Sequence, residues 1–328
     1  MKYISVILAA TGLVFFAVNS NAAGPVRPEV IISGDSWSTL PCFFGSVQSA
    51  FSNRRLEVDI HGCLKTSHIG ARADNFKSYS AYGETLKHLR VNPNAKVVYL
   101  SLGGNDMFKF WRKDMSAKEE DDLFVYIRSY IKAFVDDIHR VRPDVWVLVS
   151  GYDNGYLYAQ NPFSAYREIY EHMGRPTATE VNTGFLRFAK SLMALRGDHT
   201  EYQHHIGLMH YYYGAPEANI PAFKTLVPNL ISSLDDPARA GGVTSARNNK
   251  LAMAHIFSYF FDPHHLRPQG FMRLFEHAID IYIGGWLKGS KYDAQDAAAI
   301  GDLVDGEVSA DTEAQGADMA QREFGGQP

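Results

Sequence analysis

The chain has 328 residues, of which 46% are hydrophobic and 21% are charged, proportions that are ordinary for a folded soluble protein. This length is sufficient for one sizeable α/β core or two small domains. The formal net charge is only −4, and the chain has no basic cluster of the kind that nucleic-acid binding requires, which excludes nucleic acid as a partner.

The first 22 residues have the features of a secretory signal peptide. Lys2 supplies a positive charge, residues 4–18 form an apolar run, and small residues occupy positions 20 and 22. These features predict cleavage after Ala22, or one residue later, and export to the periplasm or out of the cell. An uncleaved anchor is the alternative. The apolar run is short for a membrane span, so we expect no stable span after cleavage.

A strand and a sharp turn follow in the mature chain. Residues 30–32 are apolar and predict a buried strand, Gly34 ends it, and residues 40–51 look helical. Ser36 therefore lies at a strand-to-helix elbow, beside helix N–H groups, a position that suits a nucleophile. The alternative is that Asp35 and Ser36 only cap the helix.

The next 100 residues alternate between strand and helix patterns. Strands are predicted over residues 56–60, 95–102 and 145–150, helices over 75–89 and 119–141, and a polar loop over 63–73. This alternation predicts a three-layer α/β/α fold around a central, mainly parallel five-stranded sheet. Ligands of such folds bind at the C-terminal ends of the strands.

The region from about residue 152 to 250 is rich in aromatic residues and reads less clearly. We expect a fifth strand at 206–213 and helices at 180–195, 221–234 and 248–261. We interpret the region as an insertion that covers or walls the substrate cleft, where tyrosines could stack on sugars or line an acyl groove. Ordinary packing of these aromatic residues is the alternative.

The C-terminal part divides into a helix and an acidic tail. Residues 271–287 predict a last amphipathic helix, so the main domain is expected to span residues 23–290. From Asp293 to the end the chain has nine acidic residues and one basic residue. We therefore expect residues 291–328 to form a disordered tail.

Cys42 and Cys63 are the only cysteines. An even pair in an exported protein predicts a disulfide, and two reduced, buried thiols are the alternative. If the first two strands are neighbours in the sheet, the bridge ties two loops beside the candidate nucleophile.

Three short motifs carry the chemistry. They are Gly-Asp-Ser-x-Ser at residues 34–38, Gly-x-Asn-Asp at 103–106 and Asp-x-x-His at 262–265. In this order they resemble the SGNH (GDSL-type) hydrolases, whose fold is flavodoxin-like, over roughly residues 28 to 275. The resemblance implies that Ser36 is the nucleophile, His265 the general base and acid, and Asp262 the group that orients the imidazole. His264 is the competing base.

The same resemblance implies an oxyanion hole with three donors. The Ser36 N–H and the Asn105 side-chain amide supply two of them. A backbone glycine N–H supplies the third, and we assign it to Gly70, with Gly62 as the alternative.

These observations predict an exported serine hydrolase that cleaves small-molecule, lipid or glycan esters, as an esterase or lipase. The alternatives are a carbohydrate O-acetylesterase for envelope or plant polysaccharide and a non-catalytic glycan-binding protein on the same fold. No cofactor is expected. No metal is expected either, because adjacent histidines at 204–205 and 264–265 do not share an ion easily and no ligand spacing accompanies them.

Overall fold

A single sheet forms the centre of the computed structural model, which describes residues 27–153, 164–206, 265–266 and 268–288. Its five strands lie in the order β2-β1-β3-β4-β5, and all four neighbouring pairs are parallel. The strands are β1 (Glu29–Gly34), β2 (Asp59–Ser67), β3 (Ala95–Ser101), β4 (Trp146–Ser150) and β5 (Thr200–Gln203). This is the flavodoxin-like strand order, and it confirms the predicted fold class.

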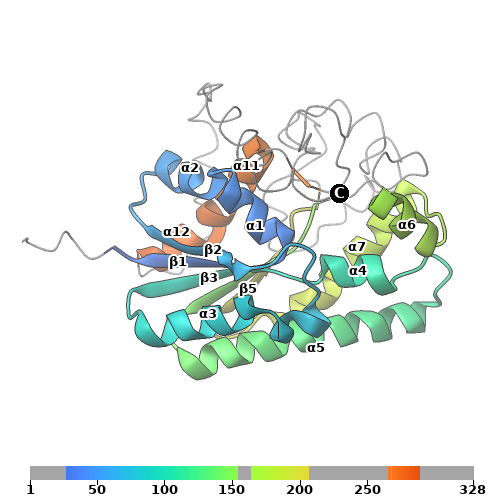
Figure 1. Cartoon of the computed structure of the whole chain (residues 1–328), viewed down its shortest axis with the longest axis horizontal. Coiled ribbons are helices and arrows are strands. Elements are labelled where there is room, and N and C mark those ends of the chain that lie inside the picture. Colours follow the sequence, from blue (N-terminus) through green and yellow to red (C-terminus); the bar gives the residue numbers. More distant parts are fainter. Residues whose placement is uncertain (1–26, 154–163, 207–264, 267, 289–328) are drawn as a thin grey trace, which may run out of the picture.

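Helices cover both faces of the sheet (Figure 1). They are α1 (Ser36–Phe43), α2 (Ser46–Asn53), α3 (Ser80–Val91), α4 (Gly104–Phe110), α5 (Ala117–Val141), α6 (Ser164–His172), α7 (Ala178–Leu192), α11 (Pro268–Ala278) and α12 (Gly284–Leu287), with shorter helical turns η1 (Ala73–Ser78), η2 (Met193–Leu195) and η4 (Ile279–Ile283). On one face α3 contacts α5, and α5 contacts α7. On the other face α1 and α2 pack with α11 (Figure 1).

The central strands are apolar because both of their faces are covered. Residues 30–32, 97–100 and 147–149 are completely buried, as expected for the inner strands of a parallel sheet between two helical layers. The long helix α5 was predicted from its periodicity and begins two residues earlier than expected. The Ser116 hydroxyl accepts from the Glu119 N–H, and the Glu119 carboxylate accepts from the Ser116 N–H, so that two otherwise unpaired N–H groups are satisfied.

Two predicted elements are corrected, and one strand was not predicted. The second strand is not residues 56–60 but β2, which runs through much of the expected polar loop. The fifth strand of the described sheet is β5, which the sequence did not indicate, and the strand expected at 206–213 lies outside the described residues apart from Ile206. The expected helix over 40–51 is two helices, α1 and α2, because Gly45 separates them with a left-handed conformation (φ +68°).

The predicted disulfide between Cys42 and Cys63 is present, with a Cα–Cα distance of 5.4 Å. It joins the end of α1 to β2, and β1 and β2 are neighbours as expected. Among the described residues no helix is long and apolar enough to cross a membrane. The predicted signal peptide, the helices at 221–234 and 248–261, and the acidic tail lie outside the described residues.

Removing the disulfide should lower stability without changing the fold. The bridge closes a loop over a sequence separation of 21 residues, and in the chain-entropy model such a loop contributes about 3 kcal/mol. We expect the double variant Cys42→Ala/Cys63→Ala to lose about that much free energy of unfolding in urea titrations. An oxidised wild type that unfolds at the same urea concentration as the double variant would contradict this expectation.

Candidate active site

The turn after β1 places Ser36 at the C-terminal edge of the sheet. Gly34 has φ +128°, and a Cβ there would lie 1.9 Å from the Ser101 carbonyl oxygen, so only glycine allows β1 and β3 to approach this closely. The Asp35 N–H donates to the same carbonyl at 2.8 Å. Ser36 then begins α1 and is 4% exposed. The predicted strand-to-helix elbow is therefore formed.

Asp35 caps α1, and its capping leaves Ser36 available for another role. One Asp35 carboxylate oxygen accepts from the Trp37 N–H at 3.0 Å and the other accepts from the Tyr152 hydroxyl at 2.5 Å. Burial raises the pKa of Asp35 to about 7, and these two hydrogen bonds oppose the rise. The Tyr152 hydroxyl also accepts from the Gly104 N–H at 2.8 Å, so it links the start of α1 to the start of α4.

His265 lies against the serine although the two residues are 229 positions apart. Its Nε2 is 2.7 Å from Ser36 Oγ, and its Nδ1 is 3.4 Å from the Tyr166 hydroxyl on α6. The imidazole is 8% exposed. Asp262 and the competing base His264 lie outside the described residues, so their roles remain predictions.

Asn105 and Gly70 are held beside one another. Asn105 is in the first turn of α4, and its Nδ2 donates to the Ala71 carbonyl at 2.9 Å. That bond uses one of the two amide hydrogens and fixes the amide, and the second hydrogen remains for a ligand. Gly70 precedes Ala71 and is exposed. Within the described part of the chain, neither the Ser36 N–H nor the Gly70 N–H donates to a protein acceptor.

Gly62, the alternative donor, has a different position. It lies inside β2, in register with Ile32 of β1. A Cβ at Gly62 would meet Thr66 Oγ1 at 1.8 Å, and that hydroxyl donates to the Ile32 carbonyl. The glycine at position 62 is thus explained by the close approach of the Thr66 side chain in an irregular stretch of β2, and the geometry favours Gly70.

Two buried groups near the site were given no role from the sequence. Asp106 accepts from the Ala73 N–H at 2.6 Å and the Asp74 N–H at 3.2 Å, and so anchors the segment that follows Gly70. Burial raises the pKa of Asp106 to about 6. Tyr152 was counted only among the aromatic residues of the predicted insertion. No local pattern marks its hydroxyl as a link between two loops.

Replacing Asn105 tests the assignment of the oxyanion donor. Removal of one such donor costs about 10²- to 10³-fold in kcat in other enzymes, because the donor binds charge that develops only in the transition state. We expect Asn105→Ala to reduce kcat on a p-nitrophenyl ester by that factor, with a smaller change in KM. A variant with unchanged kcat, or one whose loss follows a lowered thermal midpoint, would count against the role.

Similarity to known proteins is low. No protein-family model matches the chain, and no curated protein matches it. Among solved structures, the chain is similar to an extracellular lipase from Streptomyces rimosus, with 15% identity over 54% of this chain and 80% of the lipase and a TM-score of 0.34. A phospholipase A1 from Streptomyces albidoflavus NA297 has 12% identity over 77% of this chain and 98% of the phospholipase, with a TM-score of 0.43. A carbohydrate esterase family 3 structure from Talaromyces cellulolyticus has 14% identity over 55% of this chain and 79% of the esterase, with a TM-score of 0.33.

These three structures are a lipase, a phospholipase and a carbohydrate esterase, and each is at most 15% identical to this chain. Independently of them, the order of the three motifs and the strand order β2-β1-β3-β4-β5 resemble those of the SGNH (GDSL-type) hydrolases.

Proposed function

We propose that this chain is a serine hydrolase that cleaves carboxylic esters through an acyl-enzyme on Ser36. The observation that carries the proposal is the 2.7 Å contact between Ser36 Oγ and His265 Nε2 at the edge of the sheet. A serine hydroxyl becomes a useful nucleophile only when an adjacent base accepts its proton, and this distance is within the reach of such a transfer.

The proposed reaction has two steps. Ser36 Oγ attacks the ester carbonyl carbon while its proton passes to His265 Nε2, and the carbonyl oxygen becomes an oxyanion. His265 then gives the proton to the leaving alcohol, which leaves an acyl group on Ser36. Water attacks the acyl-enzyme in the same way, with His265 again as base and then as acid, and releases the carboxylic acid.

The other groups support these steps. The Ser36 and Gly70 N–H groups and the second hydrogen of the Asn105 amide are the proposed oxyanion donors, because these residues come just after three adjacent strands, β1, β2 and β3. In this proposal Asp262 orients His265 through Nδ1. Tyr166 lies on the same side of the ring and helps to fix it.

One exposed apolar side chain bears on the substrate class. Ile69 is 44% exposed and directly precedes the proposed donor Gly70. An apolar group at the rim of the oxyanion hole favours esters with an acyl chain over bare acetyl groups. We therefore place an esterase or lipase ahead of a carbohydrate O-acetylesterase.

Export is part of the proposal. The N-terminal sequence has signal-peptide features, and the disulfide between Cys42 and Cys63 requires an oxidising compartment to persist. Mass determination of the mature N-terminus after expression with the full leader would test it. A chain that retains residues 1–22 would contradict the predicted cleavage.

Covalent labelling tests the central claim. A fluorophosphonate should label the folded protein once, and peptide mapping should place the label on Ser36. Hydrolysis of p-nitrophenyl esters from acetyl to palmitoyl then separates the candidates. Activity that rises with chain length supports an esterase or lipase, whereas activity on acetyl alone supports the acetylesterase. A folded protein without label or turnover would overturn the enzyme proposal in favour of the glycan-binding alternative.

A further inference from the structure

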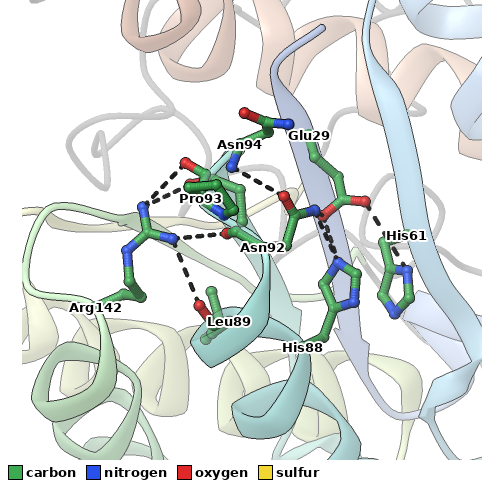
Figure 2. Close-up of polar contacts among 9 residues, drawn as sticks. Glu29, His61, His88, Leu89, Asn92, Pro93, Asn94 and Arg142 are labelled. Atoms are coloured by element: carbon green, nitrogen blue, oxygen red, sulfur yellow. Dashed lines mark hydrogen bonds and ion pairs between the residues drawn. The ribbon is translucent and has the colours of Figure 1, made fainter. Parts of the chain in front are cut away.

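A second cluster of side chains lies at the other end of the sheet. Glu29 begins β1, His61 lies in β2 and His88 lies near the end of α3. Their ligand atoms, one from each side chain, all lie within 4.8 Å of one another. Ser36 follows the opposite end of β1, so this cluster is separate from the candidate active site. In Figure 2 both imidazole rings lie beside the Glu29 carboxylate.

The polar contacts inside the cluster are unequal. Glu29 Oε2 is 2.5 Å from His88 Nε2, whereas Glu29 Oε1 is 3.9 Å from His61 Nδ1 (Figure 2). Within the described residues neither nitrogen of His61 forms a hydrogen bond. The His61 ring instead stacks on the His88 ring, with centroids 3.3 Å apart and planes 10° apart. The carboxylate thus hydrogen-bonds one imidazole and makes only the longer 3.9 Å contact with the second.

Such a set of groups suits a divalent cation. The two rings lie face to face beside one carboxylate, with one ligand atom of each side chain within 4.8 Å of the others. A bound cation accepts a lone pair from each ring and neutralises the carboxylate. Two imidazoles and one carboxylate form a typical three-ligand set for Zn²⁺, with water in the fourth position. We propose that Glu29, His61 and His88 bind a Zn²⁺ ion that cross-links β1, β2 and α3.

Hydrogen bonds around the cluster hold its side chains in place, as expected for a preorganised metal site. Asn92 donates from Nδ2 to Glu29 Oε2, the kind of outer contact that orients a carboxylate ligand. Arg142 in turn donates to the Asn92 carbonyl at 2.8 Å (Figure 2) and so fixes the end of α3. It also donates to the Ala95 carbonyl at 3.2 Å. The side chains of His61 and His88 remain 24% and 19% exposed. Solvent therefore gives an ion a path to the site.

We expect Zn²⁺ binding to need rotation of the side chains and no movement of the two strands. Zn–N bonds are about 2.0–2.1 Å long, and the three donor atoms must converge on one point. Turning the two stacked rings about their side-chain bonds points one nitrogen of each at the ion. The backbone positions of β1 and β2 stay fixed by their parallel pairing, Glu29 with Asp59 and Ile31 with His61.

Zinc titration of the untagged, EDTA-treated protein tests the proposal. The two cysteines are joined in a disulfide, so no thiol competes for the metal. We expect calorimetry to show saturable uptake of one Zn²⁺ per chain, together with a higher thermal midpoint. Uptake should persist in His172→Gln, a control on the exposed surface of α6, and in His265→Gln, which removes the imidazole beside Ser36. Persistence in His265→Gln assigns the ion to a place other than the candidate active site.

Variants of the cluster supply the contrast. Glu29→Gln and His88→Gln keep the side-chain volume nearly constant and should abolish both uptake and the thermal shift. Asn92→Ala leaves the three ligands in place and should weaken Zn²⁺ binding about tenfold. Circular dichroism of each metal-free variant checks its folding. If a ligand variant does not fold, the expected weakening of Zn²⁺ binding in Asn92→Ala still tests the proposal. Absence of saturable uptake by the wild type, or uptake that Glu29→Gln and His88→Gln leave unchanged, would overturn the proposal.

Discussion

Ser36→Ala should reduce kcat/KM for a p-nitrophenyl ester by about 10⁴- to 10⁶-fold. In serine hydrolases the loss of the nucleophile removes the whole covalent route, and what remains comes from the oxyanion donors and from substrate binding. Ser36 Oγ is the hydroxyl that faces His265 Nε2, so no other group in the described part of the site replaces it at that distance. Initial rates of p-nitrophenol release, with the uncatalysed rate subtracted, measure the effect.

Two nearby serines provide matched controls for this substitution. Ser38 belongs to the same motif, but its hydroxyl donates to the Ser33 carbonyl at 2.6 Å and is completely buried. Ser49 lies on α2, where its hydroxyl donates to the Gly45 carbonyl. Ser49→Ala should leave the rate nearly unchanged. If Ser38→Ala abolished turnover while a folded Ser36→Ala retained it, the assignment of the nucleophile would be wrong.

His265→Gln should lower kcat/KM by about 10⁴-fold or more. In other serine hydrolases, loss of the general base costs nearly as much as loss of the nucleophile, because the two act as a unit. Glutamine can still form a hydrogen bond to Ser36 Oγ but cannot accept its proton. Because the two groups act on the same step, the double variant Ser36→Ala/His265→Gln should be little slower than either single variant.

The control for this prediction is His172→Gln. His172 lies on the exposed surface of α6, where its Nε2 is 2.7 Å from the Lys109 carbonyl. Its replacement should leave turnover unchanged. The rate of fluorophosphonate labelling gives a second readout, since His265→Gln should slow labelling of a folded protein. Undiminished labelling would show that His265 does not activate Ser36.

The inner part of the fold could be read from the sequence, and the edges could not. β1, β3 and β4 are buried on both faces and show as apolar runs, so their predicted limits differ from the observed ones by two residues at most. β2 and β5 are the outer strands of the sheet. β2 carries polar residues and an irregular stretch that shifts its register against β1 between Ile32 and Gly34. β5 has only four residues, too few for a recognisable alternation.

The segment Thr200–Gln203 illustrates the limit. It pairs with β4 although it is less apolar than residues 206–213, where a strand was expected and which lie outside the described residues apart from Ile206. Pairing depends on backbone hydrogen bonds with a neighbour, and a short edge strand gives little sign of them in its side chains. The helical region over 180–195, in contrast, was recognised because α7 is long enough to repeat its apolar face.

By itself the sequence determined the α/β class, the disulfide partners and the motifs that contain Ser36, Asn105 and His265. These features depend on local patterns or on residue types that have few alternatives. Tertiary structure alone decided which side chains meet across elements. The Tyr152 hydroxyl reaches Asp35, which is 117 positions away.

The cluster at the other end of the sheet shows the same limit. No ligand spacing in the sequence predicted a metal, because Glu29, His61 and His88 lie about 30 residues apart and no short motif joins them. Parallel pairing of β1 with β2 brings the first two together, and the packing of α3 adds the third. Contacts between distant residues form only when the strands pair and the helices pack on the sheet, so a local pattern of residues cannot predict them.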